Sequence, residues 1–205
     1  MKSAVLGLCA AGVLAVSAVA TASDVEMPVR EGHPRDRFPL KFSVTPLGDP
    51  TLDEVVGLAI RDWNTVCRAV LGVEAFVLAK GDAAAQVTVA LGSGGSHRFM
   101  GLTQIEFDQD GVIEPPVRIT LTEPSERGQT PRETLMYGVT VHELGHALGL
   151  PHTTDPRSIM CCVKDGVDFN DPSFRSVYVD ARRNPDLRSV EAQLKAHYAA
   201  FWRGR

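Results

Sequence analysis

Several features that would place this chain in a large functional class are missing from its 205 residues. The net charge of −4 leaves no basic surplus for nucleic acid, so we expect no nucleic-acid partner. The glycine-rich stretch 92–96 lacks the basic residue and the helix start of a phosphate-binding loop. After residue 22 no apolar run is long enough to cross a bilayer, and there is no internal repeat or low-complexity linker. The remainder, 44% hydrophobic and 22% charged, has the composition of a globular domain.

The amino end differs from the rest of the chain. A basic start at Lys2 precedes an apolar run that ends in small residues at Ala20 and Ala22. This order is typical of a secretory signal peptide and is short for a membrane anchor. We therefore predict a signal peptide over residues 1–22, a loosely held polar lead-in over 23–37, and one folded domain over 38–205. The mature protein is expected to be secreted or periplasmic, free of the membrane and monomeric.

Cysteine is scarce in the predicted mature chain. Removing residues 1–22 leaves Cys67, Cys161 and Cys162. In an oxidising compartment three cysteines imply one bridge and one free thiol, or no bridge. Because neighbouring cysteines rarely pair with each other, a bridge from Cys67 to Cys161 or Cys162 is favoured. Cys67 also fits a buried free thiol on an apolar helix stripe, so the pairing stays open.

Hydrophobic periodicity predicts an α+β fold with a layered, α/β-type arrangement. Apolar and alternating runs predict strands at 40–44, 73–79, 86–91, 102–107 and 117–122. The stretch from Asp108 to Gly111 is interpreted as a tight turn. A calcium loop is the alternative, but only two carboxylates are present there.

Three helices are predicted. The first two open at T-x-x-E capping boxes starting at Thr51 and Thr130, and they run to about Leu71 and Leu148. An apolar stripe at helical spacing over 187–201 predicts a closing helix. The composition of residues 163–184 predicts no shape.

The clearest chemistry lies in residues 141–160, VHELGHALGLPHTTDPRSIM. His142 and His146 are four residues apart, so on a helix both side chains leave the same face. Gly149 can adopt the left-handed conformation that ends the helix and lets His152 turn back toward the other two. The spacing therefore predicts a zinc site with His142, His146 and His152 as its ligands.

Glu143 follows the first of these histidines and is not needed as a ligand. Its carboxylate is suited to act as the general base of a metal-assisted hydrolysis. A lone H-E-x-x-H arises by chance in many proteins. The added glycine, third histidine and later methionine make chance a poor explanation here.

The sequence HELGHALGLPH, followed by Ser158-Ile159-Met160, resembles the zinc site and Met-turn of the metzincin clan of metallopeptidases. Within that clan it is most similar to the matrixins. The resemblance implies a twisted, mostly parallel sheet of about five strands with three helices. It places the zinc cleft between the sheet-bearing part and a small C-terminal part, and Met160 beneath the metal as a hydrophobic floor. It also implies that one strand between residues 102 and 122 lines the cleft.

Two features depart from the matrixin pattern. Matrixins usually carry a propeptide cysteine that caps the zinc, but no cysteine lies between Cys9 and Cys67. His33 or Asp36 is an alternative cap, although an ordered or frayed tail is favoured there. Matrixins commonly have Tyr-Pro after the Met-turn methionine, where this chain has a pair of cysteines.

We predict from these residues a secreted zinc endopeptidase that acts on proteins or peptides. Its cofactor is Zn²⁺, and calcium is a weakly supported second cation. The alternatives are a zinc-dependent binding module with little activity and a narrow-specificity aminopeptidase of the same clan.

Overall fold

The computed structural model describes residues 20–21, 31–81, 84–91, 100–124, 130–163 and 167–203. The predicted signal peptide lies outside these ranges except for Ala20–Thr21, as do residues 23–30 of the lead-in and the glycine-rich stretch 92–96.

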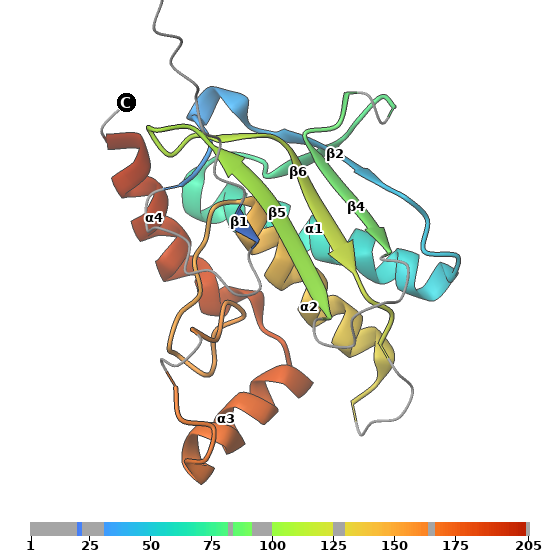
Figure 1. Cartoon of the computed structure of the whole chain (residues 1–205), viewed down its shortest axis with the longest axis vertical. Coiled ribbons are helices and arrows are strands. Elements are labelled where there is room, and N and C mark those ends of the chain that lie inside the picture. The colour runs from blue at the N-terminus through green and yellow to red at the C-terminus, as the bar shows by residue number, and fades with distance from the viewer. Residues whose placement is uncertain are drawn as a thin grey trace, which may run out of the picture.

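A single mixed sheet runs through the molecule (Figure 1). The β2–β3, β2–β4 and β4–β6 pairs are parallel, whereas β5 is antiparallel to β6 and to the two-residue strand β1. This confirms a mixed α+β fold with a mostly parallel sheet, and the five longer strands are those predicted. In spatial order the strands are β1 (Ala20–Thr21), β5 (Gly101–Phe107), β6 (Ile113–Leu121), β4 (Val87–Leu91), β2 (Leu40–Val44) and β3 (Phe76–Leu78).

The connection between β5 and β6 is the tight turn predicted at Asp108. Its Oδ1 accepts hydrogen bonds from the backbone N–H groups of Asp110 and Val112, each at 2.9 Å. Gly111 takes the positive φ of 77° that closes the turn. Asp108 Oδ1, an oxygen that a calcium ion would use, thus already accepts two backbone hydrogen bonds that shape the turn.

Two long helices, α1 (Pro50–Leu71) and α2 (Arg132–Ala147), lie behind the sheet in Figure 1. The indole Nε1 of Trp63 in α1 donates to the Val141 carbonyl in α2 at 2.9 Å. The apolar stripe of α1 is buried as its spacing predicts, including Val56, Ile60, Trp63 and Cys67. Burial of this stripe fixes α2, the helix that carries the first two histidines.

Both predicted capping boxes are wrong. The cap of α1 is Asp49, whose Oδ1 accepts from the Thr51 and Leu52 N–H groups at 2.9 and 3.3 Å. Pro50 is favoured in the first helical turn, so the helix begins before Thr51. At the start of α2, Pro131 precedes the helix and no side chain caps it.

The C-terminal part contains α3 (Pro172–Arg183), a 3₁₀ turn at Leu187–Val190 and α4 (Glu191–Arg203). Helix α4 buries its predicted apolar stripe against the core. Helix α3 was not predicted, so the described residues contain four α-helices and not three. It buries none of its residues and projects away from the sheet (Figure 1). None of the helices within the described ranges has the length and apolar character needed to cross a bilayer.

The part of the lead-in that the structure describes, residues 31–37, is packed and not loosely held. The His33 ring is 1% exposed, and its Nε2 donates to the Ala147 carbonyl at 2.9 Å. The Trp202 indole of α4 donates in turn to the His33 carbonyl at 2.9 Å. Asp36 lies on the surface, in a 3₁₀ turn at Arg35–Arg37. Neither side chain belongs to the histidine cluster, so the predicted alternative of a cap on the metal is wrong.

Candidate metal centre

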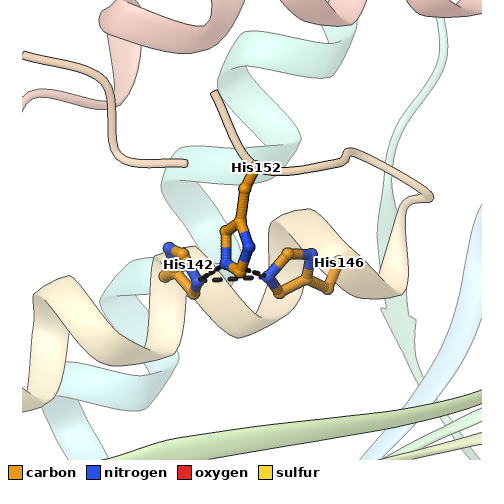
Figure 2. A group of neighbouring side chains, drawn as sticks. All are labelled: His142, His146 and His152. Atoms are coloured by element: carbon orange, nitrogen blue, oxygen red, sulfur yellow. Dashed lines mark hydrogen bonds between the residues drawn. The ribbon is translucent and has the colours of Figure 1, made fainter. Parts of the chain in front are cut away.

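The three histidines of the motif meet at one point beside α2 (Figure 2). Their Nε2 atoms form an equilateral triangle with sides of 3.1 Å. A tetrahedral zinc ion with Zn–N bonds of about 2.0–2.1 Å places its ligand nitrogens about 3.3–3.4 Å apart. The triangle therefore fits three of the four positions around zinc. Within the described ranges it is the one group of three or more potential ligand side chains that gathers in this way.

The backbone fixes the tautomer of two of these rings. His142 Nδ1 lies 2.7 Å from the Ile159 carbonyl, and His146 Nδ1 lies 2.8 Å from the Leu150 carbonyl. Because a carbonyl only accepts, each Nδ1 must carry the proton, which leaves a lone pair on each Nε2. Lone pairs that converge at 3.1 Å repel one another unless a cation lies between them. The converging lone pairs of His142 and His146 thus fit a metal ion between the rings.

Burial keeps these rings neutral. Desolvation is the main cause that lowers the pKa of His142 to about 4 and the pKa of His146 well below its usual range. The pKa of His152 is lowered for the same reason, with a further contribution from the positive charge of Arg182. Metal binding needs deprotonated imidazole, so the environment prepares the ligands at neutral pH.

Glu143, on α2, packs against β5 at Gly101 and Thr103. Its side chain is 6% exposed, and burial raises the pKa of its carboxyl to about 7, opposed by a hydrogen bond from Thr103. The Thr103 hydroxyl lies 2.6 Å from Glu143 Oε2. At Gly101 in the same strand an added Cβ would lie 2.6 Å from Glu143 Oε1, so a side chain there would displace the carboxylate.

Met160 packs against α2 at Gly145, and its role as the floor of the site stays a prediction. It is fully buried, and an added Cβ at Gly145 would overlap its sulfur. The turn that carries it is tied to the helix by the His142–Ile159 bond. It is tied to the C-terminal part by Ser189, whose Oγ accepts from the Ile159 N–H at 3.1 Å.

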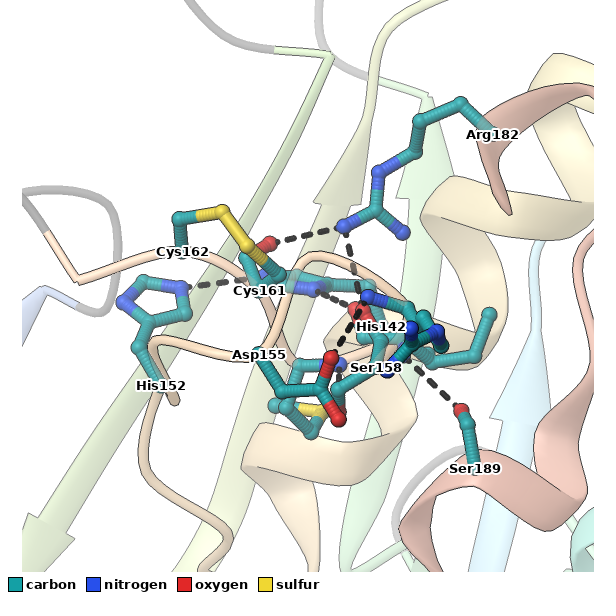
Figure 3. Close-up of a disulfide and its surroundings, with 11 residues drawn as sticks. His142, His152, Asp155, Ser158, Cys161, Cys162, Arg182 and Ser189 are labelled. Atoms are coloured by element: carbon teal, nitrogen blue, oxygen red, sulfur yellow. Dashed lines mark hydrogen bonds between the residues drawn. A yellow bond between two sulfur atoms is a disulfide. The ribbon is translucent and has the colours of Figure 1, made fainter. Parts of the chain in front are cut away.

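The residues after Met160 form a disulfide between neighbours, Cys161 and Cys162 (Figure 3). Cys67 is a free thiol buried in α1, where burial raises its pKa to about 12. The favoured pairing of Cys67 with either of the others is therefore wrong. The apolar stripe of α1 turns Cys67 into the core, while Cys161 forms an isolated β-bridge with Thr153, the residue after His152.

We expect this pairing to be visible by mass spectrometry without reduction. Trypsin should release residues 158–164 as one peptide that is two hydrogens lighter than its reduced form, because both half-cystines fall between Arg157 and Lys164. Cys67 should react with iodoacetamide only after unfolding, since a thiol with a raised pKa and no exposure is inert. A cross-linked peptide that contains Cys67 would contradict this pairing.

Four residues near the centre were missed by sequence reasoning, namely Gly101, Thr103, Arg182 and Ser189. The first two lie on β5, about 40 residues before the motif, and nothing in a single sequence shows which strand meets α2. Arg182 belongs to the stretch whose shape could not be predicted. Ser189 lies within the predicted closing helix and carries no motif of its own.

A buried carboxylate beside three converging neutral histidines, on a helix that packs against a mostly parallel sheet, defines a metal-dependent hydrolase. Residues 82–173 match the model of the Matrixin family, a family of peptidases, and this range contains the three histidines and Met160. The chain thus carries a matrixin-like metallopeptidase domain, and the predicted resemblance is confirmed. Matrixins depend on zinc, and the histidine triangle suits that ion. No curated protein gave a significant match.

Proposed function

We propose that this protein is a secreted zinc endopeptidase in which Glu143 is the general base. The main support for the proposal is that three neutral histidines placed to bind one metal ion lie beside a buried carboxylate, Glu143 of α2. Zinc, when held by His142, His146 and His152, supplies a Lewis acid that activates water and polarises a peptide carbonyl. The proton transfers are carried out by side chains of the protein.

Glu143 is suited to move a proton twice. With a pKa raised to about 7, its carboxylate is basic enough to take a proton from the attacking water at neutral pH. The same group, once protonated, can deliver that proton to the nitrogen of the leaving amine. Thr103 holds Oε2 by its hydroxyl, which fixes the direction of the carboxylate during both transfers.

Strand β5 supports cleavage within a chain. It lies at the edge of the five longer strands and carries Gly101 and Thr103 beside Glu143. An exposed edge binds an extended peptide by backbone hydrogen bonds, and the peptide can continue in both directions. The two residues of β1 pair with this edge at Ile105 and Gln104. They fall within the predicted signal peptide, whose removal would free the edge for a substrate.

Export is a further part of the proposal. The basic and apolar start of the chain suits a signal peptide, and a disulfide suits an oxidising compartment outside the cytoplasm. We propose that the mature protein is a monomer that acts free of the membrane.

Digestion of a denatured protein by the mature enzyme tests the proposed function. We expect cleavage that stops with a zinc chelator and returns when zinc is added back. A fluorogenic peptide with a blocked amino end should be cleaved as well. Cleavage of peptides with a free amino end alone would indicate an aminopeptidase. Zinc binding without any hydrolysis would indicate a binding module.

Replacing Thr103 with valine should move the pH profile. The hydroxyl stabilises the ionised form of Glu143, so its loss raises the carboxyl pKa, by about one unit for a bond of about 1.5 kcal/mol. Because Glu143 must be ionised to accept a proton, the acidic limb of kcat/KM should shift to higher pH. Thr140→Val is the matched control, since that buried hydroxyl donates to the Met136 carbonyl instead. An unshifted limb in Thr103→Val would contradict the proposed role.

A further inference from the structure

The guanidinium of Arg182 reaches from α3 to the turn beneath the metal centre (Figure 3). Its Nη2 donates to the Cys161 carbonyl at 2.9 Å and to the Ser158 carbonyl at 3.2 Å. Its Cζ lies 4.7 Å from the centre of the Tyr178 ring, one helical turn earlier. Two carbonyls and an aromatic face therefore hold this cation in one position.

This fixed cation lies close to the histidine triangle. The Ser158 and Cys161 carbonyls that it holds lie on either side of Ile159 and Met160, and the Ile159 carbonyl accepts from His142. The charge of Arg182 contributes to the lowered pKa of both His142 and His152. A substrate bound across the metal would therefore pass near this side chain.

Two nitrogens of the Arg182 guanidinium, Nε and Nη1, have no partner among the described residues. Among the described residues no atom pairs with Nε or Nη1, and no carboxylate forms an ion pair with the group. Neither nitrogen is buried without a partner, so both are accessible to solvent. Nη2, which belongs to both two-donor edges, is already engaged, but Nε and Nη1 can each still donate a charge-assisted hydrogen bond to a carboxylate.

We propose that Arg182 selects peptide substrates that carry a carboxylate close to the scissile bond. The inference rests on the proposed peptidase function and adds its specificity. The carboxylate can belong to an acidic side chain or to the carboxyl end of the peptide. Little side-chain entropy is lost when Arg182 binds a carboxylate, because the protein already holds the guanidinium in place.

Matched peptides test the proposal and distinguish the two sources. One set replaces Gln by Glu at each position around the cleaved bond, and a second compares a free carboxyl end with its amide. We expect one carboxylate position to raise kcat/KM about tenfold over its neutral match, as for a hydrogen bond to a charged group. Arg182→Gln should bring that ratio close to one. Arg175→Gln, on the same helix two turns away, should leave it unchanged.

Charge reversal separates recognition from support of the turn. Arg182→Glu should prefer a Lys peptide over the Glu peptide, an inversion that mere loosening of the turn would not produce. Zinc content measured on each variant checks that the metal centre is intact. A wild-type enzyme that cleaves all the matched peptides equally, or an Arg182→Gln variant that keeps the preference, would overturn the inference and leave the peptidase function standing.

A binding assay keeps the inference testable if no peptide is cleaved. Fluorescence anisotropy on the zinc-loaded Glu143→Gln variant measures affinity for the same peptides. A tighter fit for the carboxylate form that disappears when Arg182→Gln is added supports recognition by Arg182. Equal affinities would overturn it, whereas absent cleavage by the wild type would overturn the peptidase function alone.

Discussion

Replacing Glu143 with glutamine should lower kcat/KM for peptide cleavage by about 10²–10⁴-fold while zinc stays bound. Glutamine has the same shape and can still accept the hydrogen bond from Thr103, so the pocket keeps its geometry. It cannot accept a proton at neutral pH, so only the general base is lost. Peptide kinetics and metal analysis on the same preparation measure both effects.

His142→Ala is the companion variant, because it removes a ligand and leaves the carboxylate in place. It should lose both zinc and activity, whereas Glu143→Gln should lose activity alone. Hydrolysis by Glu143→Gln within tenfold of the wild type would exclude Glu143 as the base. Loss of zinc from that variant would show that the glutamate supports the metal site and not the proton transfer.

Replacing Gly149 with alanine should destabilise the domain by about 3 kcal/mol or more. Gly149 has φ of +83°, a conformation that costs an L-residue about 1–2 kcal/mol. An added Cβ would in addition overlap the Glu31 carbonyl oxygen, a backbone atom that cannot turn away as a side chain could. Relief of that overlap must displace either the lead-in or the chain that leads to His152. Urea unfolding should therefore show a lower midpoint, and zinc affinity should fall with it.

Gly48 provides a matched control, because it has the same φ of +83° with nothing within 4 Å of an added Cβ. Gly48→Ala should cost only the conformational energy of about 1–2 kcal/mol, with zinc affinity unchanged. The difference between the losses of unfolding free energy in the two variants measures the contact between the end of α2 and residue 31. Equal losses for both would show that this contact does not matter.

The parts of the fold that could be predicted are those set by local periodicity. The strand at 40–44 alternates apolar and polar residues, and the stripe on the first helix has regular spacing, so burial of one face decides their structure. The histidine triangle could be predicted for a similar reason. Two ligands share one helix face, and Gly149 supplies the conformation that lets the third return.

The rest depends on which distant segments meet. Thr103 and Gly101 matter because β5 packs on α2, and that contact has no signature near the motif. The described part of the lead-in is packed because His33 is hydrogen-bonded both to the end of α2 and to Trp202, although its polar composition predicts a loosely held segment. Helix α3 has no buried face, so hydrophobic periodicity, the main sequence signal for a helix against a core, gives no indication of it.

The disulfide has a practical consequence for making the protein. A bridge between neighbours closes almost no loop, so it removes very little entropy from the unfolded chain. Cys67 is unpaired, and no disulfide joins two distant elements of the described chain. Within the described residues the distant elements are therefore held together by non-covalent contacts. We expect the domain to fold in the reducing cytoplasm of an expression host, without an oxidant or a disulfide isomerase.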